Sequence, residues 1–133
     1  MTVVLANGCF DVFHAGHLAH LKEARMMGDK LIVALTMDEY VNKREGMPIN
    51  TWTDRADLLR ELRCVDEVFC TRSAVEAIYD VKPDIFVKGI DYAGGDKFTE
   101  DIAGACKAVG ASIAYTTSMK RSAEEIIRKA IGG

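Results

Sequence analysis

Segments with the pattern of a buried β-strand alternate with segments of helical spacing along the whole chain. The strand candidates are residues 2–6, 30–36, 67–70, 84–87 and 111–115, and the helix candidates are 16–27, 53–62, 74–79, 99–109 and 123–131. Strands that alternate with helices indicate βαβ units and right-handed crossovers. We therefore expect an α/β fold: a single Rossmann-like, doubly wound domain over residues 1–133 with a five-stranded, mostly parallel sheet.

The composition excludes several classes of protein. The chain is 49% hydrophobic and 28% charged with a net charge of −3, which lacks the basic excess of most nucleic-acid-binding domains. Its longest aliphatic run, Leu31 to Leu35, is far shorter than the ~20 residues that span a membrane. The first residues lack a basic region and run directly into Asn7-Gly8, so we interpret them as a strand and not as a signal peptide. We expect no nucleic-acid or membrane partner and a cytoplasmic location.

The cysteines and the third histidine do not indicate a metal site. Cys9, Cys64, Cys70 and Cys106 form no Cys-x-x-Cys pair, so we expect free, buried thiols in a reducing compartment. Although His14, His17 and His20 are evenly spaced, a helical wheel places His20 about 200° from Leu18. With Leu18 facing the core, we expect His20 at the surface.

The strongest chemical signal follows the first strand. Residues 8–17 read Gly-Cys-Phe-Asp-Val-Phe-His-Ala-Gly-His, where the strand gives way to a helix. The free N–H groups and positive dipole at a helix start suit a phosphate. Gly16 has no side chain to keep a polyphosphate from the backbone. His14 and His17 can then donate hydrogen bonds to phosphoryl oxygens as charge builds in a transition state.

Other candidate ligand contacts follow later strands, each with an ordinary structural alternative. A strand-end turn holds Lys88, Gly89, Asp91 and Tyr92; a charged loop holds Lys43 and Arg44, with Arg55 opening the next helix; and a polar turn holds Lys120, Arg121 and Ser122. Their alternatives are a plain turn, solvated charges and a helix cap. Trp52 either stacks on a ligand or packs in the fold.

The Gly-x-Phe-Asp and His-x-Gly-His strings after a first strand resemble the signature of the cytidylyltransferase-like nucleotidyltransferases. That superfamily transfers a nucleoside monophosphate from a nucleoside triphosphate to a phosphorylated acceptor and releases pyrophosphate. The resemblance implies catalytic roles for His14, His17 and Lys43; nucleotide contacts by Gly8, Cys9, Phe10, Asp11, Gly16, Lys88, Gly89, Asp91, Lys120, Arg121 and Ser122; and substrate contacts by Lys43, Arg44, Trp52, Arg55 and Tyr92. It also implies Mg²⁺ with the triphosphate, Asp11 orienting either the metal or the loop, and a homodimer.

The resemblance leaves the donor nucleotide open. Val87-Lys88-Gly89-Ile90-Asp91-Tyr92 looks like a motif of the adenylyltransferase domain of ADP-heptose synthases, which implies ATP and a sugar 1-phosphate. The short length, without a kinase domain, is closer to the glycerol-3-phosphate cytidylyltransferases and CTP, although these usually replace the lysine. We favour the heptose type.

The final motif departs from the superfamily. Relatives usually have Ser-Thr-Thr or Ser-Ser-Ser where this chain has Ser122-Ala123-Glu124, although Lys120 and Arg121 can compensate by their charge. A nucleotide-binding sensor that has lost turnover is therefore an alternative of another class. The intact pair of His14 and His17 argues against it, because binding alone does not need both donors. No P-loop or Gly-x-Gly-x-x-Gly string is present.

Overall fold

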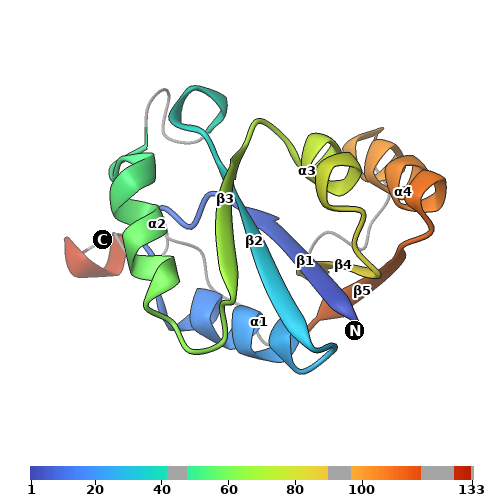
Figure 1. Cartoon of the computed structure of the whole chain (residues 1–133). Helices are drawn as coiled ribbons and strands as arrows, with labels where there is room; N and C mark the ends of the chain where they lie inside the picture. The colour runs from blue at the N-terminus through green and yellow to red at the C-terminus, as the bar shows by residue number, and fades with distance from the viewer. Residues whose placement is uncertain (42–47, 90–96, 118–127, 133) are drawn as a thin grey trace.

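Strands and helices alternate along the chain as the sequence predicts (Figure 1). The computed structural model describes residues 1–41, 48–89, 97–117 and 128–132. The strands are β1 (Val3–Gly8), β2 (Lys30–Thr36), β3 (Glu67–Thr71), β4 (Ile85–Gly89) and β5 (Ser112–Thr116). The helices are α1 (Ala15–Arg25), α2 (Trp52–Arg60), α3 (Ala74–Val81) and α4 (Lys97–Val109), and a short 3-10 helix (Asp38–Tyr40) follows β2. Most of the helix predicted over 123–131 lies outside the described residues.

The strands form one sheet in the order β3-β2-β1-β4-β5. Every strand pair within the described residues is parallel, which confirms the predicted doubly wound α/β fold. The strand order reverses between β1 and β4, because the chain builds outward from β1 first on one side and then on the other. In such sheets a ligand binds beyond the carboxyl ends of the strands at this switch point.

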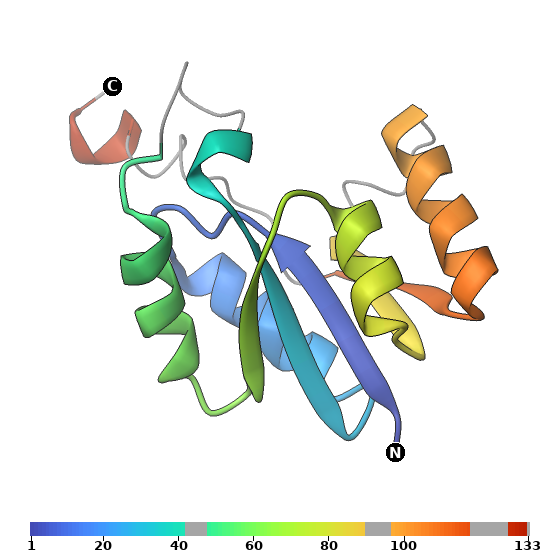
Figure 2. The same ribbon diagram turned by 45° about the horizontal axis from the view of Figure 1, so that its top comes forward.

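Helices cover both faces of the sheet (Figure 2). Leu31, Val33 and Leu35 of β2 pack with α1 and α2, whereas Ile32 and Ala34 pack with α3 and α4. A strand that is buried on both faces does not need alternating apolar and polar residues. This explains why β2 is apolar almost throughout. Each fully buried aliphatic side chain contributes about 1.5–3 kcal/mol to folding, so β2 is a major part of the core.

The four cysteines are free thiols, but only Cys106 is buried, and the expectation of burial is wrong for Cys70, which is exposed. Desolvation raises the pKa of the Cys64, Cys70 and Cys106 thiols. Among the residues that the structure describes, no helix has the length and apolar character needed to cross a bilayer.

Candidate active site

The loop between β1 and α1 begins with a tight turn at the switch point. Phe10 and Val12 adopt left-handed backbone conformations, with φ of 47° and 57°. Such conformations are uncommon for residues other than glycine, so the surrounding contacts must hold them. A Cβ atom at Gly8 would lie 2.8 Å from Cε2 of Phe10, so any larger residue there would require this ring to shift. Gly8 and Phe10, predicted to bind nucleotide, thus also shape the loop.

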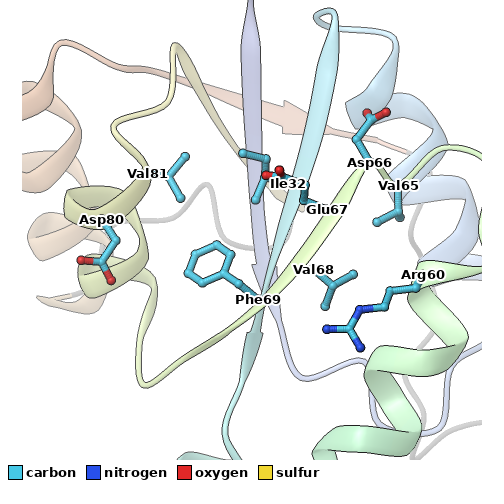
Figure 3. A pocket seen from close by; sticks show the side chains of 9 residues that line it. All are labelled: Ile32, Arg60, Val65, Asp66, Glu67, Val68, Phe69, Asp80 and Val81. Atoms are coloured by element: carbon cyan, nitrogen blue, oxygen red, sulfur yellow. The ribbon is translucent and has the colours of Figure 1, made fainter.

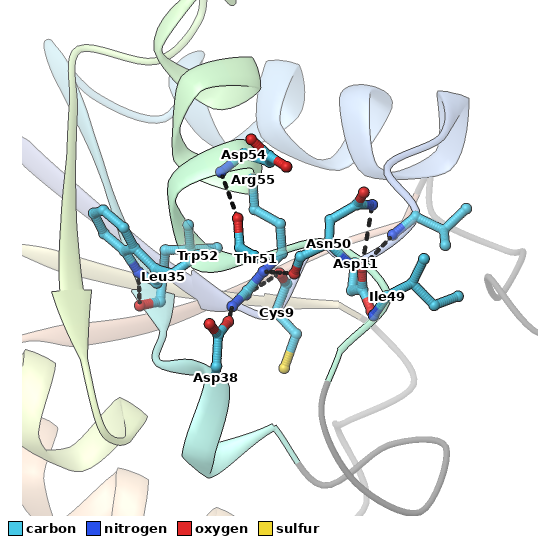
Figure 4. Close-up of polar contacts among 11 residues, drawn as sticks. Cys9, Asp11, Leu35, Asp38, Ile49, Asn50, Thr51, Trp52, Asp54 and Arg55 are labelled. Atoms are coloured by element: carbon cyan, nitrogen blue, oxygen red, sulfur yellow. Dashed lines mark hydrogen bonds and ion pairs between the residues drawn. The ribbon is translucent and has the colours of Figure 1, made fainter.

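Asp11 ties this loop to the segment before α2 (Figure 4). Its Oδ2 accepts the Ile49 N–H at 2.6 Å, and its Oδ1 accepts the Asn50 N–H at 2.9 Å and the Val12 N–H at 3.2 Å. The side-chain amide of Asn50 also donates to Oδ1 at 3.3 Å. Only 4% of Asp11 is exposed, and these N–H groups compensate for the loss of water around its charge.

The contacts of Asp11 also bear on the metal role that the resemblance implies. Both carboxylate oxygens already accept hydrogen bonds from N–H groups in a buried position. Among the described residues, no group of three or more His, Cys, Asp or Glu side chains is arranged to hold a metal ion. Of the two roles implied for Asp11, the contacts favour orienting the loop.

Arg55, predicted to contact substrate, is buried within the same network. Its Nη1 donates to the Cys9 carbonyl oxygen at 2.8 Å and its Nε to the Asn50 carbonyl oxygen at 3.1 Å. Its Nη2 forms an ion pair with Oδ1 of Asp38 at 2.5 Å. The guanidinium thus joins three segments of the fold, and with Arg55 2% exposed these contacts favour a structural role.

Trp52 packs in the fold, which is the second of its two predicted roles. Its indole N–H donates to the Leu35 carbonyl oxygen at 2.9 Å, and the ring packs against the core beneath α1 and α2. The Arg60 guanidinium lies 5.6 Å from the ring centroid, in cation–π geometry. These contacts account for Trp52 without a ligand.

His14 and His17 cap the first turn of α1 reciprocally. Nδ1 of His14 accepts the Gly16 N–H at 3.0 Å, while Nδ1 of His17 accepts the backbone N–H of His14 at 3.2 Å. Because each Nδ1 acts as an acceptor, each neutral ring carries its proton on Nε2. The cap therefore fixes both the orientation of the rings and the nitrogen that can donate to a ligand.

Aromatic contacts hold the His17 ring from several sides. It stacks on His14 with centroids 3.8 Å apart, and it meets Phe10 at 5.3 Å and Phe13 at 5.4 Å. The first turn of α1 carries no acidic side chain, so nothing there opposes an anion at the positive end of the helix dipole. These ring contacts hold the imidazole in place at a helix start that suits a phosphate.

Lys88 approaches the switch point from the other face of the sheet. It is 7% exposed and directly follows Val87, which packs on the side of α1 and α2. Successive side chains alternate across a sheet, so Lys88 belongs to the side of α3 and α4. There the positive charge of Lys88 lowers the pKa of the Cys106 thiol on α4, which partly offsets the larger rise caused by desolvation. Lys88 and His17 therefore flank the end of the sheet from opposite faces.

The expectation of a surface position for His20 is wrong. His20 is 5% exposed, and its Nδ1 lies 2.5 Å from Oγ1 of Thr116 on β5. The helix turns His20, Leu21 and Ala24 toward the sheet, with Leu18 only partly buried. The i, i+4 spacing of His20 and Ala24 was the signal for this face. Burial lowers the pKa of His20, and the charge of Glu23 partly opposes this shift.

Sequence reasoning also missed several residues that organise the site, namely Glu23, Asp38, Asn50 and Thr116. Other predicted residues lie outside the described part of the chain, and their roles stay predictions: Lys43, Arg44, Asp91, Tyr92, Lys120, Arg121 and Ser122.

A surface cavity of about 680 Å³ lies away from this loop (Figure 3). It lies at the amino end of β3, between the carboxyl ends of α2 and α3. Its lining residues are Ile32, Arg60, Val65, Asp66, Glu67, Val68, Phe69, Asp80 and Val81. In parallel sheets ligands bind beyond the carboxyl ends of the strands. Because this cavity lies at the amino end of β3, it is separate from the candidate site.

Comparison with known proteins agrees with this geometry. Residues 5–129 match the family described as cytidylyltransferase-like. The chain belongs to the cytidylyltransferase-like family. The predicted resemblance is thereby confirmed, with a match that runs from β1 to beyond β5.

Two curated relatives with the same name are similar to this chain. The chain is 48% identical over 94 residues to "Bifunctional protein HldE" of Helicobacter hepaticus, which covers 68% of this chain and 20% of the relative. It is 45% identical over 111 residues to the protein of that name from Aliarcobacter butzleri, covering 80% of this chain and 23% of the relative. The chain thus spans about a fifth to a quarter of the length of these relatives.

A solved structure matches the fold over almost its whole length. The lipopolysaccharide core biosynthesis protein from Thermoplasma volcanium superposes with a TM-score of 0.76 at 28% identity. The match covers 90% of this chain and 99% of that protein. This family member therefore has a structural relative of similar extent.

Proposed function

We propose that this member of the cytidylyltransferase-like family is a nucleotidyltransferase that moves AMP from ATP to a sugar 1-phosphate. The observation that carries the proposal is the reciprocal cap of His14 and His17, which occupies Nδ1 of both rings at the switch point and leaves Nε2 of each as the nitrogen that carries the proton. The similarity to proteins named HldE favours the ADP-heptose-synthase type over the CTP-dependent alternative. The sequence Val87-Lys88-Gly89-Ile90-Asp91-Tyr92 supports the same choice.

In the proposed reaction, a phosphate oxygen of the acceptor attacks the α-phosphorus of ATP in line. The bond from the α-phosphorus to the bridging oxygen breaks, and pyrophosphate leaves with the electron pair. His14 and His17 donate from Nε2 to phosphoryl oxygens that gain charge in the transition state. Preorganised donors of this kind typically contribute about a hundredfold or more to the rate.

The remaining predicted contacts complete the proposal. Lys43, Arg121 and Ser122 contact the triphosphate, with Lys120 adding positive charge beside them. Lys88 and Asp91 face the acceptor or the sugar and base of the nucleotide. Mg²⁺ enters bound to the triphosphate, since Mg²⁺ commonly keeps substrate phosphates and water as most of its ligands. We also propose a cytoplasmic homodimer, and light scattering of the purified protein tests its mass.

Pyrophosphate release over a panel of substrates tests the proposed activity. The panel pairs ATP or CTP with a heptose 1-phosphate, hexose 1-phosphates or glycerol 3-phosphate, and His17→Asn serves as the inactive control. Release from ATP with a sugar 1-phosphate is the expected result. Release only from CTP with glycerol 3-phosphate would instead establish the cytidylyltransferase alternative. ATP binding without pyrophosphate from any acceptor would favour the sensor.

A further inference from the structure

Two polar contacts fasten α1 to the carboxyl end of β5. Nδ1 of His20 lies 2.5 Å from Oγ1 of Thr116, across 96 residues of sequence. One helical turn further on, both carboxylate oxygens of Glu23 accept the Thr117 N–H at 3.2 Å. Thr116 is fully buried and His20 is 5% exposed, so water does not compete for the first contact.

These contacts join the two sides of the switch point. His17, which precedes His20 by three residues, begins the same rigid helix beside β1. Thr116 pairs in register with Gly89 at the end of β4, next to Lys88. A shift of α1 relative to β5 would therefore change the spacing between His17 and the end of β4.

A polar pair fixes that spacing more narrowly than an apolar contact would. Aliphatic side chains can slide past one another with little change in energy, whereas a buried hydrogen bond is strong only over a narrow range of distance and angle. Breaking it leaves a buried polar group unsatisfied, which is unfavourable. The His20–Thr116 contact thus restricts α1 to one position along the sheet.

We propose that His20 and Thr116 are positioning residues for nucleotidyl transfer, which set the distance between the His14–His17 pair and the end of β4. This inference rests on the proposed function. His20 and Thr116 act through His17 and Lys88, so their loss affects the rate of transfer more than it affects nucleotide affinity.

Thr116→Val tests the inference, because valine keeps the shape of threonine without its hydroxyl. Thr71→Val is the matched control: Thr71 is also a buried strand-end threonine, 1% exposed, whose hydroxyl donates to the Ser73 carbonyl oxygen at 2.9 Å. Thr116→Ser and His20→Asn are rescue variants, since both keep a polar atom at the contact. His20→Leu replaces Thr116→Val if the latter does not fold.

Two readouts decide the outcome. We expect Thr116→Val to lower kcat by about tenfold to a hundredfold relative to Thr71→Val, with KM for ATP within about threefold and activity largely kept in Thr116→Ser. In ¹⁵N NMR, Thr116→Val should shift the ring nitrogens of His17 and the amide of Gly89, and Thr71→Val should not. Equal kcat values and unmoved resonances in the two valine variants would overturn the inference. If the wild type transfers nothing to any acceptor, the proposed function fails, and the NMR comparison alone decides whether His20 and Thr116 position His17.

Discussion

The imidazole of His14 stacks on that of His17 with ring centroids 3.8 Å apart, and each ring accepts a backbone N–H through Nδ1. One pair of side chains therefore begins α1 through Nδ1 and leaves the proton of each neutral ring on Nε2. Capping and catalysis can be separated, because they use different nitrogens of the same rings.

His14→Asn should keep the fold and lose the reaction. Asparagine is among the best N-cap residues, and its side-chain oxygen can replace Nδ1 as the acceptor. It has no donor at the position of Nε2, so we expect kcat to fall about a hundredfold or more. Circular dichroism and the melting temperature monitor the fold. His14→Ala is the comparison, since it should also lose about 1 kcal/mol of stability with the cap. A His14→Asn enzyme with wild-type kcat would remove His14 from the mechanism.

Asp11→Asn separates the two roles implied for Asp11. The amide cannot accept every N–H that the carboxylate accepts, so a buried donor is left unsatisfied and stability should fall by about 1–3 kcal/mol. The Mg²⁺ concentration that gives half-maximal activity should stay unchanged. Asp57→Asn, at an exposed position on α2, is the control for loss of one negative charge. A large rise in the Mg²⁺ requirement would restore Asp11 as a metal ligand.

Arg55→Lys distinguishes a residue of the fold from a substrate contact. Lysine keeps the charge but cannot reach the Cys9 and Asn50 carbonyl oxygens and Asp38 together. We expect urea unfolding to show a loss of about 2–3 kcal/mol, with KM for both substrates within about threefold. Arg60→Lys, with a half-exposed side chain, should change stability little. Unchanged stability together with a large rise in KM would support the substrate contact predicted from the sequence.

The buried His20 should make the fold sensitive to mild acid. Burial lowers the pKa of His20 below its ordinary value of 6.5, so the unfolded chain binds this proton more tightly than the folded chain does. The stability from neutral His20 is fully present above about pH 6.5 and is lost as the pH falls from there toward the lowered pKa. The melting temperature should therefore fall more between pH 7.5 and 5.5 in the wild type than in His20→Asn. Equal slopes in the two proteins would contradict the buried neutral state.

Local patterns in the sequence predict the fold well. The run Lys30 to Thr36 is apolar throughout because β2 is buried on both faces, and its predicted bounds agree with the structure. The helix after β1 is also predicted, since glycine and histidine mark its start. These features depend on residues that are close together in the chain, where spacing carries the information.

Contacts between distant segments are not predictable in this way. Asp11 bonds to Asn50, and Arg55 to Cys9, only because the sheet brings these segments together. Nothing in their local sequence distinguishes a buried structural hydrogen bond from a ligand contact. His20 is a mixed case. Its spacing from Ala24 is a local indication of the buried face, but its contact with the Thr116 hydroxyl, 96 residues away, has no local indication.

Transfer of label from α-³²P-ATP to a sugar 1-phosphate, compared between the wild type and His17→Asn under single-turnover conditions, tests the central claim most directly. Asparagine at position 17 keeps an acceptor for the His14 N–H but lacks the Nε2 donor. We predict labelled nucleotide sugar from the wild type and a rate at least about a hundredfold lower from the variant, with ATP bound by both. Equal rates from the two proteins, or bound ATP that never passes its label to an acceptor, would contradict it.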